Sequence, residues 1–329
     1  MNKSKNNILL KLLIMIFKSV ILCLAIYIIY TRINSKDRIH EITDLFTVKL
    51  FEPQPLAVLL LVFMLMVLNW LIESKKWQLL VYRVDNINIF TAVKAVFSGA
   101  AISIFTPYRV GEMIGRVYHI EPDVRVQAAL LTAIGNFAQI LVTLLFGTIG
   151  LFTCIDWVAP MTSMSSYGII TASVGLSILL LFTYYYLPSV IVFVERFISV
   201  QRIKKYLSAY TKLNKKDLGI IFLLSFIRYC VYCSQCYLLL QVCGVELPLV
   251  KGLALIAVLF LIITVVPSIV FTELILRSSI ALILFQAVTD NEIAVISASF
   301  GLWFINLVLP AIGGSAILLY SKRKRKKAI

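Results

Sequence analysis

The chain has 329 residues, of which 60% are hydrophobic and 14% are charged, and its mean hydropathy is +0.95. This composition excludes a soluble globular domain and indicates a polytopic membrane protein. The formal net charge of +15 comes mainly from basic clusters near the N-terminus, between Arg196 and Lys216, and from Lys322 to Lys327. Such clusters are typical of orientation signals and of contacts with anionic lipid headgroups, so we do not expect nucleic acid as a partner.

Six apolar runs are long enough to cross a hydrocarbon core of about 30 Å as helices. The first is too long for a signal-peptide core and lacks a small-residue cleavage site, so we expect it to be a retained transmembrane helix. Basic residues are enriched in alternate connections, which predicts a multi-pass protein of the cell (cytoplasmic) membrane with both termini in the cytoplasm. The runs span residues 8–30, 54–72, 127–151, 168–192, 218–243 and 293–320.

Two further apolar regions, 90–126 and 252–288, must each begin and end on the same side of the membrane if this alternation holds. A proline, Pro107 or Pro267, breaks each region into two arms of about 15–18 residues, which is short for a full span. The sequence leaves open whether each region is a re-entrant hairpin or a pair of full spans. Their opposite orientations are compatible with an inverted repeat, an arrangement in which transporters bind substrate at broken helices near the midplane.

The predicted fold is therefore all-α: a polytopic integral membrane protein with about six full spans and two broken or re-entrant helix pairs. We expect a single transmembrane domain over residues 1–321 and a basic cytoplasmic tail over 322–329. The chain contains no Gly-rich phosphate loop, no nucleophile elbow and no connection long enough for a catalytic domain. We therefore predict no enzyme activity, catalytic residue, metal site or cofactor.

Ionisable residues follow the first proline, although an ionisable side chain in a bilayer costs at least ~2.5 kcal/mol even on the mild insertion scale. The helix that restarts after Pro107 presents unpaired N–H groups to an anion, and Arg109 can bind a phosphate or carboxylate with two hydrogen bonds. Glu112 and Arg116 are spaced to form an i, i+4 ion pair. Gly111 permits a close backbone approach or a tight bend. These features predict an anion site at the break.

A second cluster follows Pro267, where Glu273 and Arg277 repeat the i, i+4 spacing. Arg228, ten residues into the run 218–243, is a further charge inside an apolar segment. Together with Arg109, Glu112 and Arg116 these residues carry two more positive than negative charges, which favours an anionic ligand such as a lipid phosphate. The alternative is structural: the pairs lock the broken helices, and Arg228 extends toward the interface.

A charged motif surrounds the first proline: Thr106-Pro107-Tyr108-Arg109-Val110-Gly111-Glu112, with Ser98-Gly99 before it and Arg116 after it. This motif resembles the Pro-x-Arg-x-Gly-Glu-x-x-x-Arg signature of the lysylphosphatidylglycerol synthase transmembrane region, also called the flippase-like domain family. Trp77 resembles part of an Arg-Trp block of that family, with Lys76 in place of the arginine. The resemblance implies movement of an amphipathic lipid or a lipid-linked sugar between leaflets. The synthases continue into an aminoacyl-transferase domain, and since this chain ends after its basic tail we expect no lipid synthesis by that route.

Two functions fit these observations. In the first, the protein is a flippase or transporter of a lipid or lipid-linked glycan, in which Arg109 and Arg116 hold the headgroup phosphate, Glu112 positions Arg116, and Glu273 and Arg277 close the opposite side. In the second, it is a non-transporting accessory protein or enzyme subunit that binds a polyprenyl-phosphate or phospholipid donor. The expected partners are membrane lipids, anionic or polyprenyl-phosphate, and either function is compatible with a homo-oligomer or a membrane synthase partner. A scaffold without a ligand is the remaining alternative.

Overall fold

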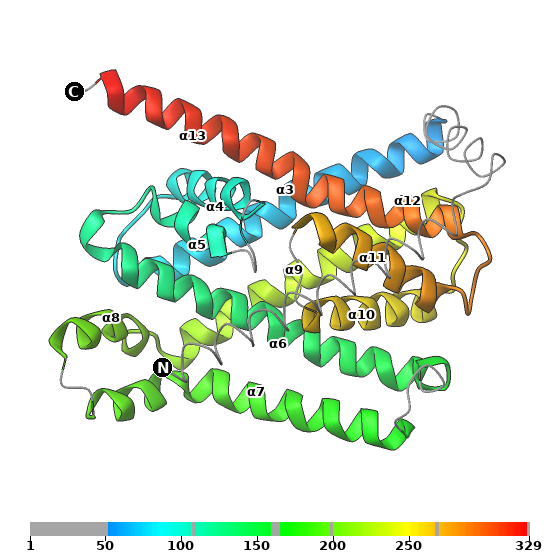
Figure 1. Ribbon diagram of the computed structural model, residues 1–329, viewed down its shortest axis with the longest axis horizontal. Helices are drawn as coiled ribbons and strands as arrows, with labels where there is room; N and C mark the ends of the chain where they lie inside the picture. Colours follow the sequence, from blue (N-terminus) through cyan, green and yellow to red (C-terminus); the bar gives the residue numbers. More distant parts are fainter. Residues whose placement is uncertain are drawn as a thin grey trace, which may run out of the picture.

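The computed structural model describes residues 52–104, 106, 110–158, 165–197, 200–266 and 270–327. Every regular element within these ranges is a helix, so the predicted all-α class is confirmed (Figure 1). Five helices are long and apolar enough to cross a membrane, and they correspond to five of the six predicted runs; the sixth, 8–30, lies outside the described residues. The five are Pro53–Val81, Pro122–Asp156, Ser166–Phe193, Lys215–Val242 and Glu292–Ser321.

The order of the helices follows the predicted sequence of full spans and broken pairs. In chain order they are α3 (Pro53–Val81), α4 (Ile89–Ser103), α5 (Val110–Val117), the 3₁₀ turn η3 (Pro122–Val124), α6 (Arg125–Val158), α7 (Ser166–Glu195), α8 (Gln201–Thr211), α9 (Lys215–Val242), α10 (Leu249–Val265), α11 (Val270–Phe285), α12 (Glu292–Trp303), the π-helical turn η5 (Phe304–Val308) and α13 (Leu309–Lys327).

Polar caps fix the start of α9 and join it to α3. The side chain of Asn214 accepts a hydrogen bond from the backbone N–H of Asp217, and the Asp217 carboxylate accepts one from the backbone N–H of Asn214. This reciprocal capping box satisfies donors that the first turn of a helix leaves unpaired. The same carboxylate binds Arg83, just beyond α3, at 3.0 Å. One end of α3 therefore lies beside one end of α9.

Both predicted helix breaks are present. Helix α4 ends at Ser103 before α5 begins, and α10 ends at Val265 before α11 begins; Pro107 and Pro267 themselves lie outside the described residues. At 1.5 Å per residue, α4 is about 22 Å long, α5 about 12 Å, and α10 and α11 about 24–26 Å. Each is shorter than the hydrocarbon core of about 30 Å, which favours re-entrant hairpins. The hairpins occupy opposite halves of the bundle (Figure 1).

Helix α5 is shorter than the second arm predicted for this region. It ends at Val117, and the chain turns before Glu121, which is extended with a ψ of 138°. Pro122 accounts for the non-helical conformation of Glu121, because a proline disfavours helical conformation at the residue before it. The chain then enters η3 and α6, the next full span.

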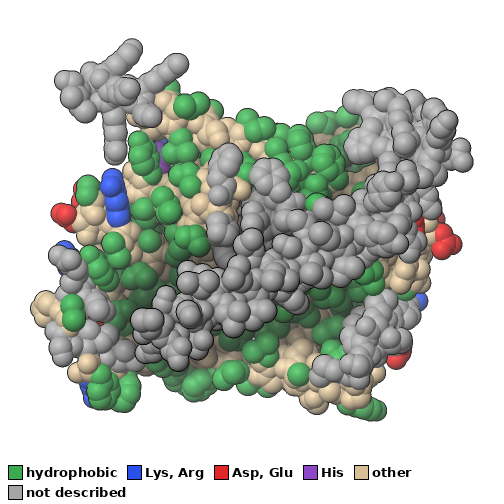
Figure 2. All heavy atoms as spheres, in the orientation of Figure 1, with side chains coloured by type: hydrophobic (Ala, Val, Ile, Leu, Met, Phe, Trp, Pro, Cys, Tyr) green, Lys and Arg blue, Asp and Glu red, His purple; other side chains and the backbone are tan. Residues whose placement is uncertain are grey.

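The outer surface has the polarity expected of a membrane protein. On the face shown in Figure 2, the coloured acidic and basic side chains lie toward the two ends of the molecule, and hydrophobic side chains predominate between them. Helix α7 lies at the edge of the bundle (Figure 1), and only 11% of its most apolar window is buried. Since lipid tails are as apolar as leucine, helices in a bilayer associate mainly through close packing rather than through the hydrophobic effect.

Glycines provide this close packing where α4 meets α5 and α13. A Cβ atom on Gly115 of α5 would collide with the carbonyl oxygen of Ser98, and one on Gly314 of α13 would collide with the carbonyl oxygen of Phe97. Both obstacles are backbone atoms of α4, which no rotamer change can move. Helix α4 is therefore in close backbone contact with α5 on one side and with α13 on another.

We expect Gly115→Ala to destabilise the protein by about 1–3 kcal/mol, the usual cost of overpacking, because the methyl group would force α5 away from α4. The control is Gly175→Ala on α7, where an added Cβ has no heavy atom within 4 Å and where alanine is the better helix former. Thermal unfolding of the purified variants in detergent micelles measures both. Equal unfolding temperatures for the two variants would contradict the close α4–α5 contact.

Candidate functional site

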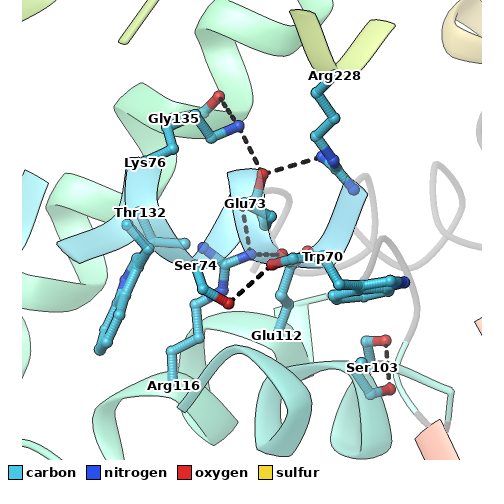
Figure 3. Close-up of polar contacts among 12 residues, drawn as sticks. Trp70, Glu73, Ser74, Lys76, Ser103, Glu112, Arg116, Thr132, Gly135 and Arg228 are labelled. Carbon is cyan, nitrogen blue, oxygen red and sulfur yellow. Dashed lines mark hydrogen bonds and ion pairs between the residues drawn. The ribbon is translucent and has the colours of Figure 1, made fainter. Parts of the chain in front are cut away.

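Three basic side chains converge on one carboxylate inside the bundle (Figure 3). Glu73 of α3 binds Lys76 of the same helix at 2.7 Å, Arg116 of α5 at 2.7 Å, and Arg228 of α9 at 3.0 Å. Arg116 also binds Glu112 one turn earlier on α5, so the ion pair predicted from the i, i+4 spacing is present. These five residues, Glu73, Lys76, Glu112, Arg116 and Arg228, are the Glu73 network.

Three of the five members of the network are almost completely enclosed. The side chains of Lys76 and Arg116 are each 1% exposed, that of Glu73 is 2% exposed, and Arg228 retains 23%. The Lys76 ammonium also donates to the carbonyl oxygen of Gly135 on α6 at 3.4 Å. Burying an ion without a counter-ion costs several kcal/mol, so each of these charges depends on the others. Three cations against two carboxylates leave one surplus positive charge.

Two asparagines orient Arg228. Its Nε donates to Oδ1 of Asn69 on α3 at 3.0 Å, and Nδ2 of Asn69 donates to Oδ1 of Asn306 at 3.2 Å. Asn306 lies in η5, and its own Nδ2 donates to the carbonyl oxygen of Leu302. Turns of π-helix are rare and occur frequently at functional sites. Here the turn brings a polar side chain of the last span to the network.

The network lies deep within the bundle. Glu73 is eight residues from the end of α3 and Arg228 is thirteen from the start of α9, which at 1.5 Å per residue is about 12 and 20 Å. The Arg83–Asp217 bridge holds these two helix ends side by side, so both distances are measured from the same face. Glu73 is twenty residues, about 30 Å, from the start of α3, so the network lies nearer the Arg83–Asp217 end of this helix.

Local packing explains how Arg116 reaches Glu73. A Cβ atom at Gly99 of α4 would lie 3.0 Å from Cγ of Arg116 and 2.8 Å from the carbonyl oxygen of Glu112, so the absence of a side chain at residue 99 makes room for the arginine. Gly111 allows the close backbone approach predicted for it, because a Cβ there would lie 2.6 Å from the carbonyl oxygen of Ile102. Its N–H donates to Oγ1 of Thr106 at 2.7 Å. Arg109 lies outside the described residues.

The second predicted pair forms a separate cluster. Arg277 binds Glu273 one turn earlier on α11 at 3.0 Å and donates to the hydroxyl oxygen of Tyr232 on α9, also at 3.0 Å. Its guanidinium lies over the rings of Tyr232 and Phe260, 5.7 and 5.8 Å from their centroids, in positions that favour cation–π attraction. Tyr232 is one helical turn from Arg228 on α9. The two charged clusters are thus neighbours along this helix.

Sequence reasoning did not place Glu73, Lys76, Asn69 or Asn306 in the site. The predicted run 54–72 ends where hydropathy falls, whereas α3 continues to Val81. The available signal was the i, i+3 spacing of Glu73 and Lys76, followed by further apolar residues. Within the described parts of the chain, no group of three His, Cys, Asp or Glu side chains could hold a metal ion.

Replacing Glu73, which three basic side chains share, should cost more stability than replacing Glu112, which is partly exposed. We expect Glu73→Gln to lower the free energy of unfolding by about 3–5 kcal/mol, because it leaves buried cations without their counter-ion. Glu112→Gln should cost on the order of 1 kcal/mol, since that side chain is 19% exposed and its one ion pair with a described residue is to Arg116, which keeps Glu73. Chemical unfolding in micelles measures the difference, and equal losses would show that Glu73 is not the shared counter-ion.

Comparison with known proteins gives one family. The family model described as the lysylphosphatidylglycerol synthase TM region matches residues 8–298, a range that includes the Glu73 network and the Glu273–Arg277 pair. Comparison with curated proteins gives no match. The matched range covers most of the chain, and the fold has the two helix breaks predicted from the sequence. The chain belongs to the lysylphosphatidylglycerol synthase transmembrane region family.

Proposed function

We propose that the protein is a flippase or transporter that binds the anionic headgroup of a lipid or lipid-linked glycan and moves it between leaflets. The observation that carries this proposal is the Glu73 network: three basic and two acidic side chains joined by ion pairs, about 12–20 Å from the Arg83–Asp217 end of a membrane-embedded bundle. Ionisable residues at that depth are costly and typically mark substrate or ion pathways. Membership of a family of membrane domains named for a lipid-modifying synthase supports a lipid as the ligand.

The geometry suggests a division of roles among the arginines. Two carboxylates, Glu73 and Glu112, neutralise Arg116, and its side chain is 1% exposed, so we assign it to holding α5 in place. Arg228 shares Glu73 with other cations and is 23% exposed, which makes it the better headgroup ligand. Arg109, which precedes α5 in the sequence, remains a proposed ligand, and Glu273 with Arg277 is proposed to close the opposite side.

The two broken helix pairs supply a route for alternating exposure. They occupy opposite halves of the bundle (Figure 1), as expected if one opens toward each face and the halves rock about a central site. We propose that the protein lies in the cytoplasmic membrane of the cell. In this orientation both chain termini face the cytoplasm, as do the ends of α3 and α9 that the Arg83–Asp217 bridge joins. The basic residues of α8 and its flanks, between α7 and α9, support that orientation.

Lipid transfer by the purified protein distinguishes transport from donor binding. Proteoliposomes containing fluorescent phosphatidylglycerol, quenched from outside with dithionite, should show protein-dependent movement between leaflets. Arg228→Ala should lower the initial rate at least about tenfold, because one charge-assisted contact contributes roughly 1.5–3 kcal/mol. Arg83→Ala, which removes an exposed arginine also bound to a carboxylate, is the control and should retain the wild-type rate.

The alternative outcomes are informative. If the wild-type protein carries a specific co-purifying lipid but does not move lipid, it is a non-transporting accessory protein or enzyme subunit that presents a polyprenyl-phosphate or phospholipid donor. If transport persists in a well-folded Arg228→Ala variant, that arginine is not the headgroup ligand. If the wild-type protein neither moves nor selectively retains lipid, the charged clusters are structural.

A further inference from the structure

Arg228 has one side of its guanidinium available. Its Nη1 faces Glu73 and its Nε donates to Asn69, whereas no hydrogen bond joins Nη2 to another described residue. Lys76 and Arg116 have almost no exposed surface. A ligand can therefore reach Arg228 without displacing any contact of the Glu73 network, but it cannot reach the other two cations in this way.

Trp70 supplies an independent observation at the same place. Its ring lies beneath the Arg228 guanidinium, 6.0 Å from the ring centroid to the guanidinium carbon (Figure 3). The residue is 8% exposed, and its buried Nε1–H has no hydrogen-bond partner among the described residues. Trp77, two turns later on α3, has the opposite status, because its Nε1 donates to Oγ1 of Thr132 at 3.0 Å. A buried donor without an acceptor is unfavourable, and Trp70 bears one beside a partly exposed arginine.

The charge of the network limits what can bind there. Among the described residues, the three basic and two acidic side chains of the network leave a surplus of one positive charge. A ligand with a single negative charge would make the buried cluster neutral. A phosphomonoester or a diphosphate, which carries more than one negative charge at neutral pH, would leave uncompensated negative charge in a low-dielectric interior.

We infer that Arg228 and Trp70 form a seat for a phosphodiester, the Arg228–Trp70 seat, and that this seat discriminates against phosphomonoesters and diphosphates. The inference rests on the proposed function, since it specifies the headgroup that the Glu73 network receives. Nη2 of Arg228 and Nε1 of Trp70 both donate to oxygens of the phosphodiester. This chemistry has two sources, a glycerophospholipid and a polyprenyl monophosphate linked to a sugar, and both carry one negative charge.

Native mass spectrometry of the full-length protein in micelles tests the selectivity. The probes are dioleoyl phosphatidylglycerol and a polyprenyl phosphomannose as phosphodiesters, with dioleoyl phosphatidic acid and polyprenyl diphosphate as the more highly charged competitors. We expect at least one phosphodiester to bind about tenfold more tightly than either competitor, and the better of the two identifies the source. Equal or tighter binding of a competitor overturns the inference.

Two conservative variants test the seat itself. Arg228→Lys keeps the charge but removes the planar fork, and Trp70→Phe keeps an aromatic ring but removes the donor. We expect binding of the preferred phosphodiester to weaken about tenfold in the first and severalfold in the second. The matched controls are Arg83→Lys, whose arginine binds Asp217, and Trp77→Phe, whose tryptophan already has an acceptor. Both should bind like wild type once unfolding temperatures show that they are folded.

Measuring transport on the same variants separates this inference from the proposed function. If the wild-type protein binds phosphodiesters selectively through the seat but moves no lipid, the transport proposal fails and the seat stands. If the wild-type protein moves lipid and both seat variants bind and transport normally, the seat is overturned and transport stands. If folded Trp77→Phe and Trp70→Phe variants lose phosphodiester binding equally, Nε1 of Trp70 is not the donor to the ligand.

Discussion

The single carboxylate of Glu73 is the interaction on which the charged interior depends. It is shared by cations from three helices, α3, α5 and α9, and so joins a re-entrant hairpin to two full spans. In a bilayer none of these ions could be buried alone. The network therefore fixes the relative position of the three helices and also concentrates positive charge at one depth, so that the feature that holds the fold together also forms the candidate site.

Much of the fold follows from local sequence. The apolar runs predict the five described spans, and the prolines predict the helix breaks, because both depend on residues within a few turns of one another. The ion pairs Glu112–Arg116 and Glu273–Arg277 are likewise encoded by i, i+4 spacing. By contrast, Glu73 pairs with Arg228 across 155 positions, and Asn69 bonds to Asn306 across 237. No periodicity within one chain specifies such contacts.

The same distinction between local and distant contacts explains why the structure suggests other roles for the arginines than local spacing does. From the sequence, Arg116 had one carboxylate partner and remained available to an anion. In the folded protein it has a second, Glu73, and is enclosed, whereas the Arg228 side chain is 23% exposed. The position of α4 against α5 is also beyond local reasoning, since the role of Gly99 depends on the Arg116 side chain that crosses it.

The π-helical turn η5 has a mechanical consequence. A π-turn accommodates an additional residue and so rotates the faces of the helix that follows relative to the helix that precedes it. Before the turn, α12 packs against α9 and α11; after it, α13 packs against α4, where Gly314 meets the backbone of Phe97. The last span, α12 with η5 and α13, therefore contacts both hairpins, so a rigid-body shift of this span would change the packing of both.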